Sequence, residues 1–505
     1  MADSAEQVYE RVCAHVRRTA LLSSIEELLG WDERTMLPKG GGGYRAEQIT
    51  LLSGMVHERW TDPRLGDWLG ELAAGPLAAD RFSDTGANLR WLKREHERRA
   101  KLPKALVEEL ARTAVLGQQA WDQARKNDDF AAFRPLLEKL IGLKRQEAEA
   151  LGYSESPYDA LLDEYEPDQR TSQLVEVLGR LRDELVPLVD AIRESGRRPD
   201  ASILARTYPV DVQESFGREA AARIGFDFER GRLDVTNHPF CCSPGPDDCR
   251  ITTRYDEHAF AGAFFGILHE AGHGIYEQGL RADQAGLPLG QAVSLGLHES
   301  QSRMWENLVG RSRAFWEHFF PLAKRRFSAL TDVALDDFCF AINDVRPSLI
   351  RVEADEATYN LHILIRFELE RALLEDDLQA GDLPGAWNEK YRGYLGIEPP
   401  NDADGVLQDI HWSAGLVGYF PTYTLGNLYA AQFFARAEAD LGGLADSFRR
   451  GDFRPLFDWL RANIHRQGRR YSAGELVEHV TGAPLSHGPL VEHLRGKFEP
   501  LYGGR

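Results

Sequence analysis

The chain has 505 residues, with 60 Lys and Arg against 79 Asp and Glu, so its formal net charge is −19. An acidic balance of this size repels phosphate backbones, and we do not expect nucleic acid as the main ligand. Hydrophobic residues make up 43% and charged residues 28% of the chain, which is typical of a globular protein and excludes a disordered one. The longest run of apolar or small residues, Ala259–Leu268, is shorter than the roughly 20 residues of a membrane helix.

The N-terminus and the cysteines indicate a cytoplasmic protein. The first residues are polar and lack the apolar stretch of a secretory signal. Five cysteines are an odd number, thinly spread over a long chain, and this usage is typical of reduced thiols in the cytosol.

Helical periodicity dominates the chain from its beginning. In the first helical segment, which ends near Trp31, apolar residues recur every three or four positions with charged residues between them. Glycine- and proline-rich breakers interrupt the pattern at Pro38–Gly43, Glu194–Asp200, Gly279–Gly290 and Gly396–Gly405. None of these is long enough to be a flexible linker, and we predict one all-α, mainly helical domain over residues 1–505.

One region departs from the helical pattern. Between Thr207 and Tyr255, three short segments rich in β-branched and aromatic residues follow one another: TYPVDVQ, RLDVTNHPF and CRITTRY. They predict the strands of one small sheet.

A buried helix with a metal-binding motif follows the predicted sheet. The segment that begins at Ala259 is apolar on most faces and ends at Gly279. It contains His269, Glu270 and His273 in the pattern H-E-x-x-H, which places both imidazoles on one helix face, one turn apart. One zinc ion can bind both rings, while Glu270 can reach a water at the metal without being a ligand.

A catalytic zinc needs a third protein ligand and an open fourth position. The next helical segment, which ends at Gly310, carries Glu299, 26 residues beyond His273. In a two-helix hairpin this carboxylate can face the imidazoles and complete a His2Glu site. His298 is the competing ligand on the same turn, and we prefer Glu299.

Seven short motifs in order along the chain resemble the thermostable metallocarboxypeptidases typified by the Taq carboxypeptidase. Besides H-E-x-x-H, they are WDERTMLP followed by YRAEQ (Trp31 to Gln48), His238-Pro239-Phe240, Asp248-x-Arg250-x-Thr252, His298-Glu299-Ser300-Gln301, Ile350-Arg351-x-x-Ala354-Asp355, and Gly405-x-x-Gln408-Asp409-x-His411-Trp412. The resemblance covers nearly the whole chain.

This resemblance implies a cytoplasmic enzyme that depends on zinc or cobalt. The implied activity is that of a carboxypeptidase with broad specificity, which removes residues one at a time from peptides with a free C-terminal carboxylate. The implied fold is helical, with a deep substrate groove akin to that of the zinc oligopeptidases, and the implied assembly is a homodimer.

The resemblance also suggests roles for residues outside the metal site. His411 and Tyr423 resemble a His and Tyr pair that stabilises the oxyanion above the scissile carbonyl in zinc oligopeptidases, with Tyr419 as a substitute for Tyr423. Arg250 and Arg351 are the candidates for holding the substrate carboxylate, because a guanidinium offers two parallel donors. His238 and Asp409, from two of the motifs, complete the expected substrate-binding set.

Two local features invite other interpretations. Cys241, Cys242 and Cys249 with His238 suggest a second zinc site, but adjacent cysteines in an extended segment point to opposite sides and the C-x2-C spacing is missing. We expect free thiols with little exposure. The four glycines at 40–43 lack the Lys-Ser/Thr of a phosphate-binding loop, and a mobile turn is expected there.

Two alternative functions use the same residues differently. A zinc oligopeptidase or dipeptidyl carboxypeptidase would use the same metal chemistry with a different substrate register. A non-catalytic scaffold with a structural metal would have four closed ligands, commonly thiolates, and the intact Glu270 argues against it.

Overall fold

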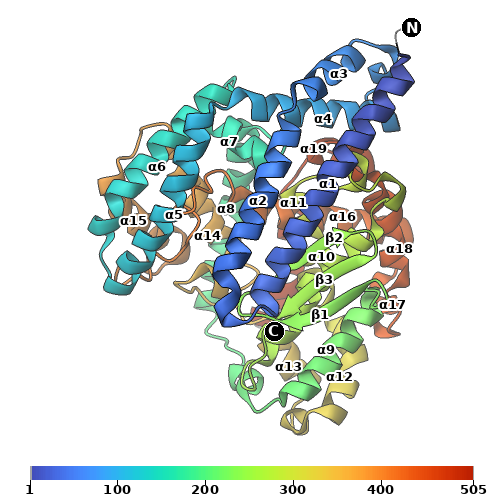
Figure 1. Cartoon of the computed structure of the whole chain (residues 1–505). Coiled ribbons are helices and arrows are strands. Elements are labelled where there is room, and N and C mark those ends of the chain that lie inside the picture. Colours follow the sequence, from blue (N-terminus) through green and yellow to red (C-terminus); the bar gives the residue numbers. More distant parts are fainter. Residues whose placement is uncertain (1–2, 504–505) are drawn as a thin grey trace.

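Helices make up most of the computed structural model, which describes residues 3–503 (Figure 1). The first begins at a capping box, in which Ser4 and Gln7 satisfy each other's backbone N–H groups. The helices of the N-terminal half are α1 Ala5–Thr35, α2 Gly42–Trp60, α3 Pro63–Ala73, α4 Asp84–Lys101, α5 Lys104–Asn127, α6 Phe130–Leu151, α7 Pro157–Tyr165, α8 Thr171–Glu194 and α9 Val210–Ile224.

The first two helices form a long antiparallel hairpin on one face of the molecule (Figure 1). The Arg45 guanidinium joins them by pairing with Asp32 at 2.8 Å. The glycine run at 40–43, where a mobile turn was expected, is divided between a 3-10 turn, Lys39–Gly41, and the start of α2 at Gly42.

The sheet has three strands, β1 Gly231–Val235, β2 Cys241–Gly245 and β3 Asp248–Thr253, in the order β1-β3-β2. Strand β1 runs parallel to β3 and β2 antiparallel to it. Two of the three predicted strands are confirmed, but 207–213 is not a strand. Residues 210–213 instead form the start of α9, whose first residue is Val210. Pro209 directly precedes this helix, a place where proline is well tolerated. The missed strand β2 contains Pro244, which is acceptable only at the edge of a sheet.

The sheet packs against the central helix α10, Phe260–Gly279, which is buried over most of its length. The next helix, α11, spans Leu295–Arg303 and continues into a π-helical turn, Met304–Val309. The predicted hairpin of two helices is therefore present, and its second helix stops before Gly310 as expected.

The C-terminal half completes the helical layers around α10 and α11. Its helices are α12 Arg313–Arg326, α13 Leu335–Ala341, α14 Tyr359–Leu374, α15 Leu383–Leu395, α16 Pro421–Leu441, α17 Leu444–Arg449, α18 Arg454–Asn463, α19 Ala473–Thr481 and α20 Gly488–Tyr502. Helix α16 packs along α11. The predicted fold class, mainly helical with one small sheet, is confirmed.

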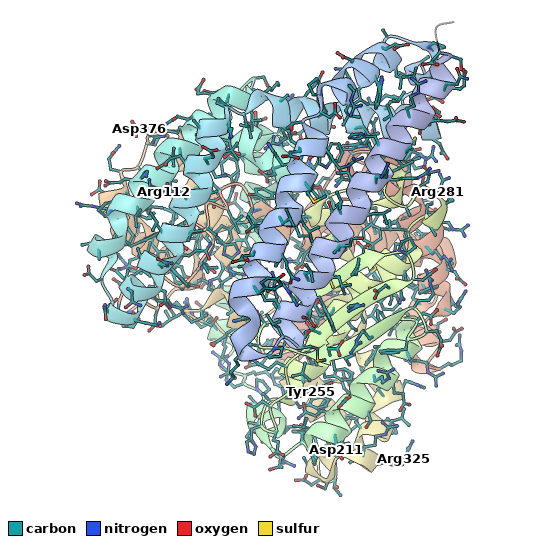
Figure 2. The ribbon with its side chains drawn as sticks, in the orientation of Figure 1. Arg112, Asp211, Tyr255, Arg281, Arg325 and Asp376 are labelled. Atoms are coloured by element: carbon teal, nitrogen blue, oxygen red, sulfur yellow. The ribbon has the colours of Figure 1, made fainter. Side chains whose placement is uncertain are left out.

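Charged side chains extend outward from the surface of this fold. Figure 2 shows Arg112, Arg325 and Asp376 at its periphery. No helix within residues 3–503 combines the length and the apolar composition that crossing a bilayer requires. One large apolar core contains the central helices, and a smaller one lies between α1, α3 and α4. That residues 1–505 form one domain stays a prediction.

Candidate metal centre and active site

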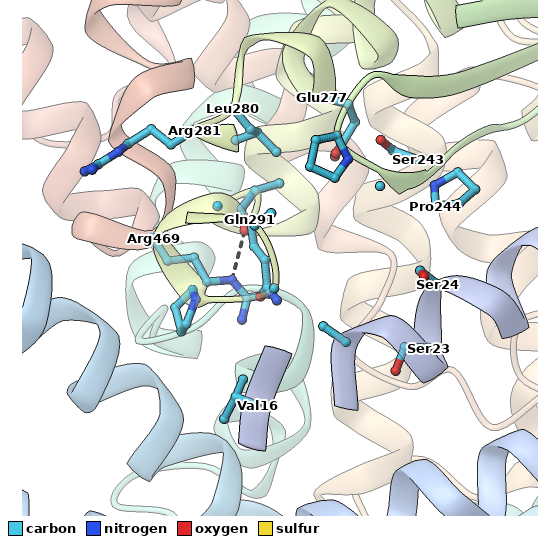
Figure 3. Close-up of a pocket in the computed structure, with 18 of the residues that line it drawn as sticks. Val16, Ser23, Ser24, Ser243, Pro244, Glu277, Leu280, Arg281, Gln291 and Arg469 are labelled. Atoms are coloured by element: carbon cyan, nitrogen blue, oxygen red, sulfur yellow. Dashed lines mark hydrogen bonds between the residues drawn. The ribbon is translucent and has the colours of Figure 1, made fainter. Parts of the chain in front are cut away.

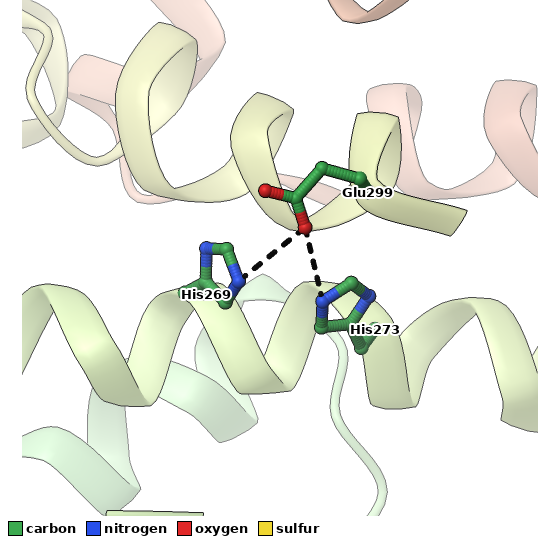
Figure 4. Close-up of side chains that lie close together, drawn as sticks. All are labelled: His269, His273 and Glu299. Carbon is green, nitrogen blue, oxygen red and sulfur yellow. Dashed lines mark ion pairs between the residues drawn. The ribbon is translucent and has the colours of Figure 1, made fainter. Parts of the chain in front are cut away.

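Two imidazoles and a carboxylate converge between α10 and α11 (Figure 4). His269 Nε2 lies 3.6 Å and His273 Nε2 lies 3.4 Å from the same oxygen, Glu299 Oε2. Two ligands bound at about 2.0–2.1 Å to a tetrahedral ion are about 3.3–3.4 Å apart, so this donor set fits one zinc-sized cation. The three side chains are the only candidate group of three or more metal ligands within residues 3–503.

Neighbouring groups hold each imidazole in orientation. His269 Nδ1 lies 2.8 Å from Glu306 Oε2, and His273 Nδ1 lies 3.1 Å from the carbonyl oxygen of His298. Both partners accept a hydrogen bond from Nδ1–H, which directs the Nε2 atom of each ring at the common point. Burial alone would lower the pKa of His269, but Glu299 and Glu306 raise it to about 9. The site therefore attracts a cation strongly.

Arg303 connects the two carboxylates of the site. Its Nε donates to Glu299 Oε1 at 2.7 Å and its Nη1 to Glu306 Oε2 at 3.3 Å. Sequence reasoning missed Arg303 and Glu306. A signal was present, because Arg303 and Glu306 follow Glu299 by four and seven positions, the spacing that places side chains on one helix face. Glu306 lies in the π-helical turn Met304–Val309.

His298, the competing ligand, points away from the triad. Its Nε2 lies 2.9 Å from Glu277 Oε1, and its ring stacks on His273 with centroids 4.4 Å apart. Its ring nitrogen is therefore engaged elsewhere, while Glu299 supplies the oxygen that faces both imidazoles.

Glu270 is buried beside the triad without a complete set of partners. Only 6% of its surface is exposed, and its Oε2 has no hydrogen-bond partner among the described residues. Burial raises its pKa to about 7. A carboxylate with a free oxygen and a pKa near neutrality can exchange a proton with a reacting group.

His411 and Tyr423 form a pair on the side of the triad where α16 begins. His411 Nε2 lies 3.2 Å from the Tyr423 hydroxyl, and the ring of Tyr419 is 5.4 Å from that of Tyr423. Tyr423 lies close to Glu299 because Gly426, one turn later on α16, has no side chain. A Cβ there would lie 2.5 Å from Glu299 Cγ.

Arg351 belongs to a buried charge cluster rather than standing free. Its Nε and Nη2 donate to Asp409 Oδ1 at 2.9 and 2.8 Å, while Arg366 Nε donates to Asp409 Oδ2 at 2.6 Å. Burial opposes ionisation of Asp409, but the two guanidinium groups hold its pKa well below the usual range. Arg351 also donates to the Tyr359 hydroxyl at 3.2 Å and stacks near Tyr423, with 5.2 Å from Cζ to the ring centre.

Arg250 and His238 are not brought to this cluster by any described contact. Arg250 on β3 pairs through Nε and Nη2 with Asp248 and stacks over Trp31 at 4.4 Å. It therefore fastens α1 to the sheet. His238 lies exposed between β1 and β2, and no described residue forms a hydrogen bond with its side chain.

The cysteines of the sheet are free thiols. Cys241 and Cys249 have sulfurs 3.8 Å apart, whereas Cys242 is not in that contact. No second candidate metal group includes them within residues 3–503. Low exposure of these thiols is confirmed, since Cys242 and Cys249 are buried and Cys241 is half-buried.

Comparisons with known proteins agree over almost the whole chain. The family model described as carboxypeptidase Taq (M32) metallopeptidase matches residues 11–498. Thermostable carboxypeptidase 1 of Thermus thermophilus is 50% identical over 99% of each chain, and carboxypeptidase 1 of Bacillus subtilis is 38% identical over 96% of this chain and 97% of its own. The crystal structure of the M32 carboxypeptidase from Deinococcus radiodurans superimposes with a TM-score of 0.95 at 42% identity, covering 99% of this chain and all of the other. The chain therefore belongs to the Taq carboxypeptidase (M32) family and is a metal-dependent carboxypeptidase.

Proposed function

We propose that this carboxypeptidase releases C-terminal amino acids one at a time, with broad specificity, from peptides that have a free C-terminal carboxylate. The proposed metal is Zn²⁺, with Co²⁺ as a possible substitute, held by His269, His273 and Glu299. One observation carries the proposal: this three-ligand group lies beside a buried carboxylate with a free oxygen. Three protein ligands leave a coordination position for a reacting group.

Glu270 is the proposed general base and later the general acid. When bound, the metal ion supplies Lewis-acid chemistry, polarising the scissile carbonyl and making a nearby water more acidic. The free Oε2 of Glu270 takes the proton from the attacking water and passes it to the leaving amine. Its buried position supports this role, because a pKa near 7 suits both transfers.

Tyr423 and His411 are the proposed donors to the oxyanion. Burial lowers the pKa of His411 to about 4, so its ring is neutral at pH 7. The two groups share a hydrogen bond of 3.2 Å, and the shared hydrogen can turn to the carbonyl oxygen as negative charge develops there. Tyr419 lies close enough to serve in place of Tyr423.

Arg351 is the proposed receptor for the substrate carboxylate. Three of the five N–H groups of its guanidinium bind Asp409 and Tyr359, which leaves two for a ligand. Arg351, Arg366 and Asp409 together carry one uncompensated positive charge. In this proposal Asp409 orients Arg351, and Arg250, His238 and Asp409 remain proposed members of the substrate-binding set.

Product analysis tests the proposal against the dipeptidyl carboxypeptidase and oligopeptidase alternative. A tetrapeptide blocked at its N-terminus should lose one residue at a time, whereas release of a dipeptide would favour the alternative. Amidating the C-terminus should lower kcat/KM by roughly one and a half to three and a half decades, and R351A should penalise only the free-acid peptide. Equal cleavage of the acid and the amide by the unmodified enzyme would contradict the proposed carboxylate recognition.

The proposal includes a cytoplasmic homodimer. Free cysteines support the cytoplasm. The dimer is supported by the α1–α2 face, defined here as Leu21, Ile25, Leu51 and Met55, which are 65%, 47%, 66% and 41% exposed. Helix α2 has no buried side chain, so a second copy of the chain is the proposed cover for these apolar residues.

A further inference from the structure

A cavity of about 460 Å³ opens one helical turn beyond the metal triad. Its walls come from α1, α4, the turn between β2 and β3, and residues 280–292 (Figure 3). Glu277 also lines it, and this residue follows His273 by four positions on the same face of α10. Because Glu277 binds His298, whose ring stacks on His273, side chains in mutual contact connect the wall of the cavity to the triad.

Most charged groups that line this cavity already have partners. Glu95 binds Arg99 at 2.7 Å, Arg230 binds Asp247, and Arg281 binds Asp84 at 2.8 Å and Asp283 at 2.7 Å. Each of these cations is therefore neutralised within the protein. Two further carboxylates line the cavity, Glu277, which binds His298, and Glu27, which accepts a hydrogen bond from the backbone N–H of Ser243.

Arg469 is the exception among the cations of the cavity. Its Nε donates to the carbonyl oxygen of Ala292 at 2.9 Å, and its guanidinium lies 5.6 Å from the ring centre of Trp91. No carboxylate of residues 3–503 lies within 4.0 Å of its nitrogens, and the same residues offer no acceptor to its two terminal nitrogens. Figure 3 shows the side chain directed into the cavity from the wall opposite Ser24 and Ser243.

Such a group is suited to a carboxylate ligand. Two terminal nitrogens of one guanidinium can donate in parallel to two carboxylate oxygens. The cavity volume is in the range of sites that hold small molecules or a few side chains. In a chain with a net charge of −19, a partly buried cation without a carboxylate partner is a specific feature rather than part of a general positive surface.

We propose that this cavity is an upstream subsite of the peptide-binding groove, where Arg469 binds the carboxylate of an acidic side chain of the substrate. The inference rests on the proposed function, because an enzyme that releases single residues holds one residue near Arg351 and must lead the rest of the peptide elsewhere. Glu277 lies four residues beyond His273, about 6 Å along the helix. An extended peptide rises about 3.4 Å per residue, so the subsite begins about two residues upstream of the cleaved bond.

The test uses N-acetylated hexapeptides with one shared C-terminal dipeptide, in which a single Glu or Gln occupies each upstream position in turn. The measured quantity is kcat/KM for release of the last residue. We expect the unmodified enzyme to prefer Glu over Gln about tenfold at one or two adjacent positions. R469Q should lose this preference and R469K should keep part of it. R466Q removes the same charge from an exposed side chain of the same segment and should keep all of it.

Taking the Glu-to-Gln ratio within each variant cancels any general loss of activity. The proposal is overturned if the unmodified enzyme shows no preference at any position, or if R469Q keeps the preference of R466Q. A second arm adds millimolar glutarate to a peptide without acidic residues. If glutarate changes kcat/KM through Arg469 while the position of Glu has no effect, Arg469 binds a free carboxylate and the upstream subsite is refuted. Release of dipeptides would contradict the proposed function instead, and product masses report this separately.

Discussion

Glu270 combines burial with an unsatisfied oxygen, an arrangement that lowers the stability of the fold. Its Oε2 has no hydrogen-bond partner among the described residues, and only 6% of its surface is exposed. An unpaired buried acceptor costs about 1–3 kcal/mol. The attacking water would supply the missing hydrogen-bond partner, which is consistent with the role proposed for Glu270.

Replacing Glu270 by Gln should separate chemistry from metal binding. E270Q keeps the size of the side chain and removes only its ability to take a proton, so metal content should be unchanged while kcat falls by roughly 10²–10⁴. Elemental analysis and the rate on a blocked dipeptide measure the two effects. Activity within tenfold of the unmodified enzyme would remove Glu270 from the mechanism.

Substitutions of Glu299 and of His298 should change the affinity for the metal by different amounts. E299A removes the carboxylate oxygen that faces both imidazoles, and the affinity for Zn²⁺ should fall by more than the roughly 10–100-fold that outer partners of a metal site cost. H298Q should have the smaller effect, because the ring of His298 is engaged with Glu277. Competitive titration with a chelator measures both. If H298Q loses the metal and E299A keeps it, His298 is the third ligand and Glu299 is not.

At the scale of elements, the site depends on how closely α16 approaches α11. Gly426 makes this approach possible, because a Cβ at that position would lie 2.5 and 2.8 Å from two side-chain carbons of Glu299. The packing of α16 against α11 therefore sets the position of Glu299 and the direction of the Tyr423 side chain.

Gly426→Ala should both destabilise the protein and weaken metal binding. Overpacking of this kind typically costs about 1–3 kcal/mol, and the displaced Glu299 should lower the affinity for Zn²⁺. Gly179→Ala in α8 is the matched control, since nothing lies within 4 Å of its added Cβ. This control should be neutral or slightly stabilising. Thermal unfolding and metal titration give the comparison, and equal behaviour of the two variants would contradict the packing argument.

The end of α10 packs on a buried histidine that makes stability depend on pH. His465 Nε2 lies 2.9 Å from Gln301 Oε1, and burial lowers the pKa of His465 to about 3 from its usual value of 6.5. Above pH 6.5 the ring is neutral in both the folded and the unfolded chain. As pH falls below 6.5, only the unfolded chain takes up the proton, so folding loses free energy until about pH 3.

H465Q should reduce this loss of stability in acid. Each pH unit inside that window is worth about 1.4 kcal/mol, so about 2 kcal/mol separates pH 6.5 from pH 5. Urea unfolding of the metal-free proteins at both pH values measures the difference, and H258Q, which changes an exposed histidine, is the control. The same pH dependence in H465Q and H258Q would show that His465 titrates normally in the fold.

The whole molecule carries a strong negative charge, yet its proposed contacts with substrate are positive. The net charge of −19 favours solubility, while the uncompensated charge of the Arg351 cluster is buried, where water screens it least. The molecule also exposes the α1–α2 face, and this apolar surface favours association between copies.

If two copies of the chain associate through the α1–α2 face, one charged residue placed in that face should dissociate the dimer. The unmodified protein should sediment as a dimer and L51D as a monomer, because a carboxylate placed in an apolar contact is costly to desolvate. V175D places the same charge on an exposed valine of α8 and should leave the dimer intact. Sedimentation velocity measures all three proteins, and a monomeric unmodified protein would contradict the proposed assembly.

Local patterns in the sequence predicted the helical fold and the buried helix with H-E-x-x-H, because helical spacing decides which residues share a face. The preference for Glu299 over the adjacent His298 rested partly on the family resemblance, and only the tertiary structure shows Glu299 Oε2 facing both imidazoles. The sequence did not reveal strand β2, the exclusion of 207–213 from the sheet, or the pairing of Asp409 with Arg351 and Arg366. These features depend on contacts between distant segments, where a neighbouring strand or an opposite charge overrides local preference. Only the tertiary structure placed Arg250 against Trp31 and left Arg469 without a carboxylate partner among the described residues.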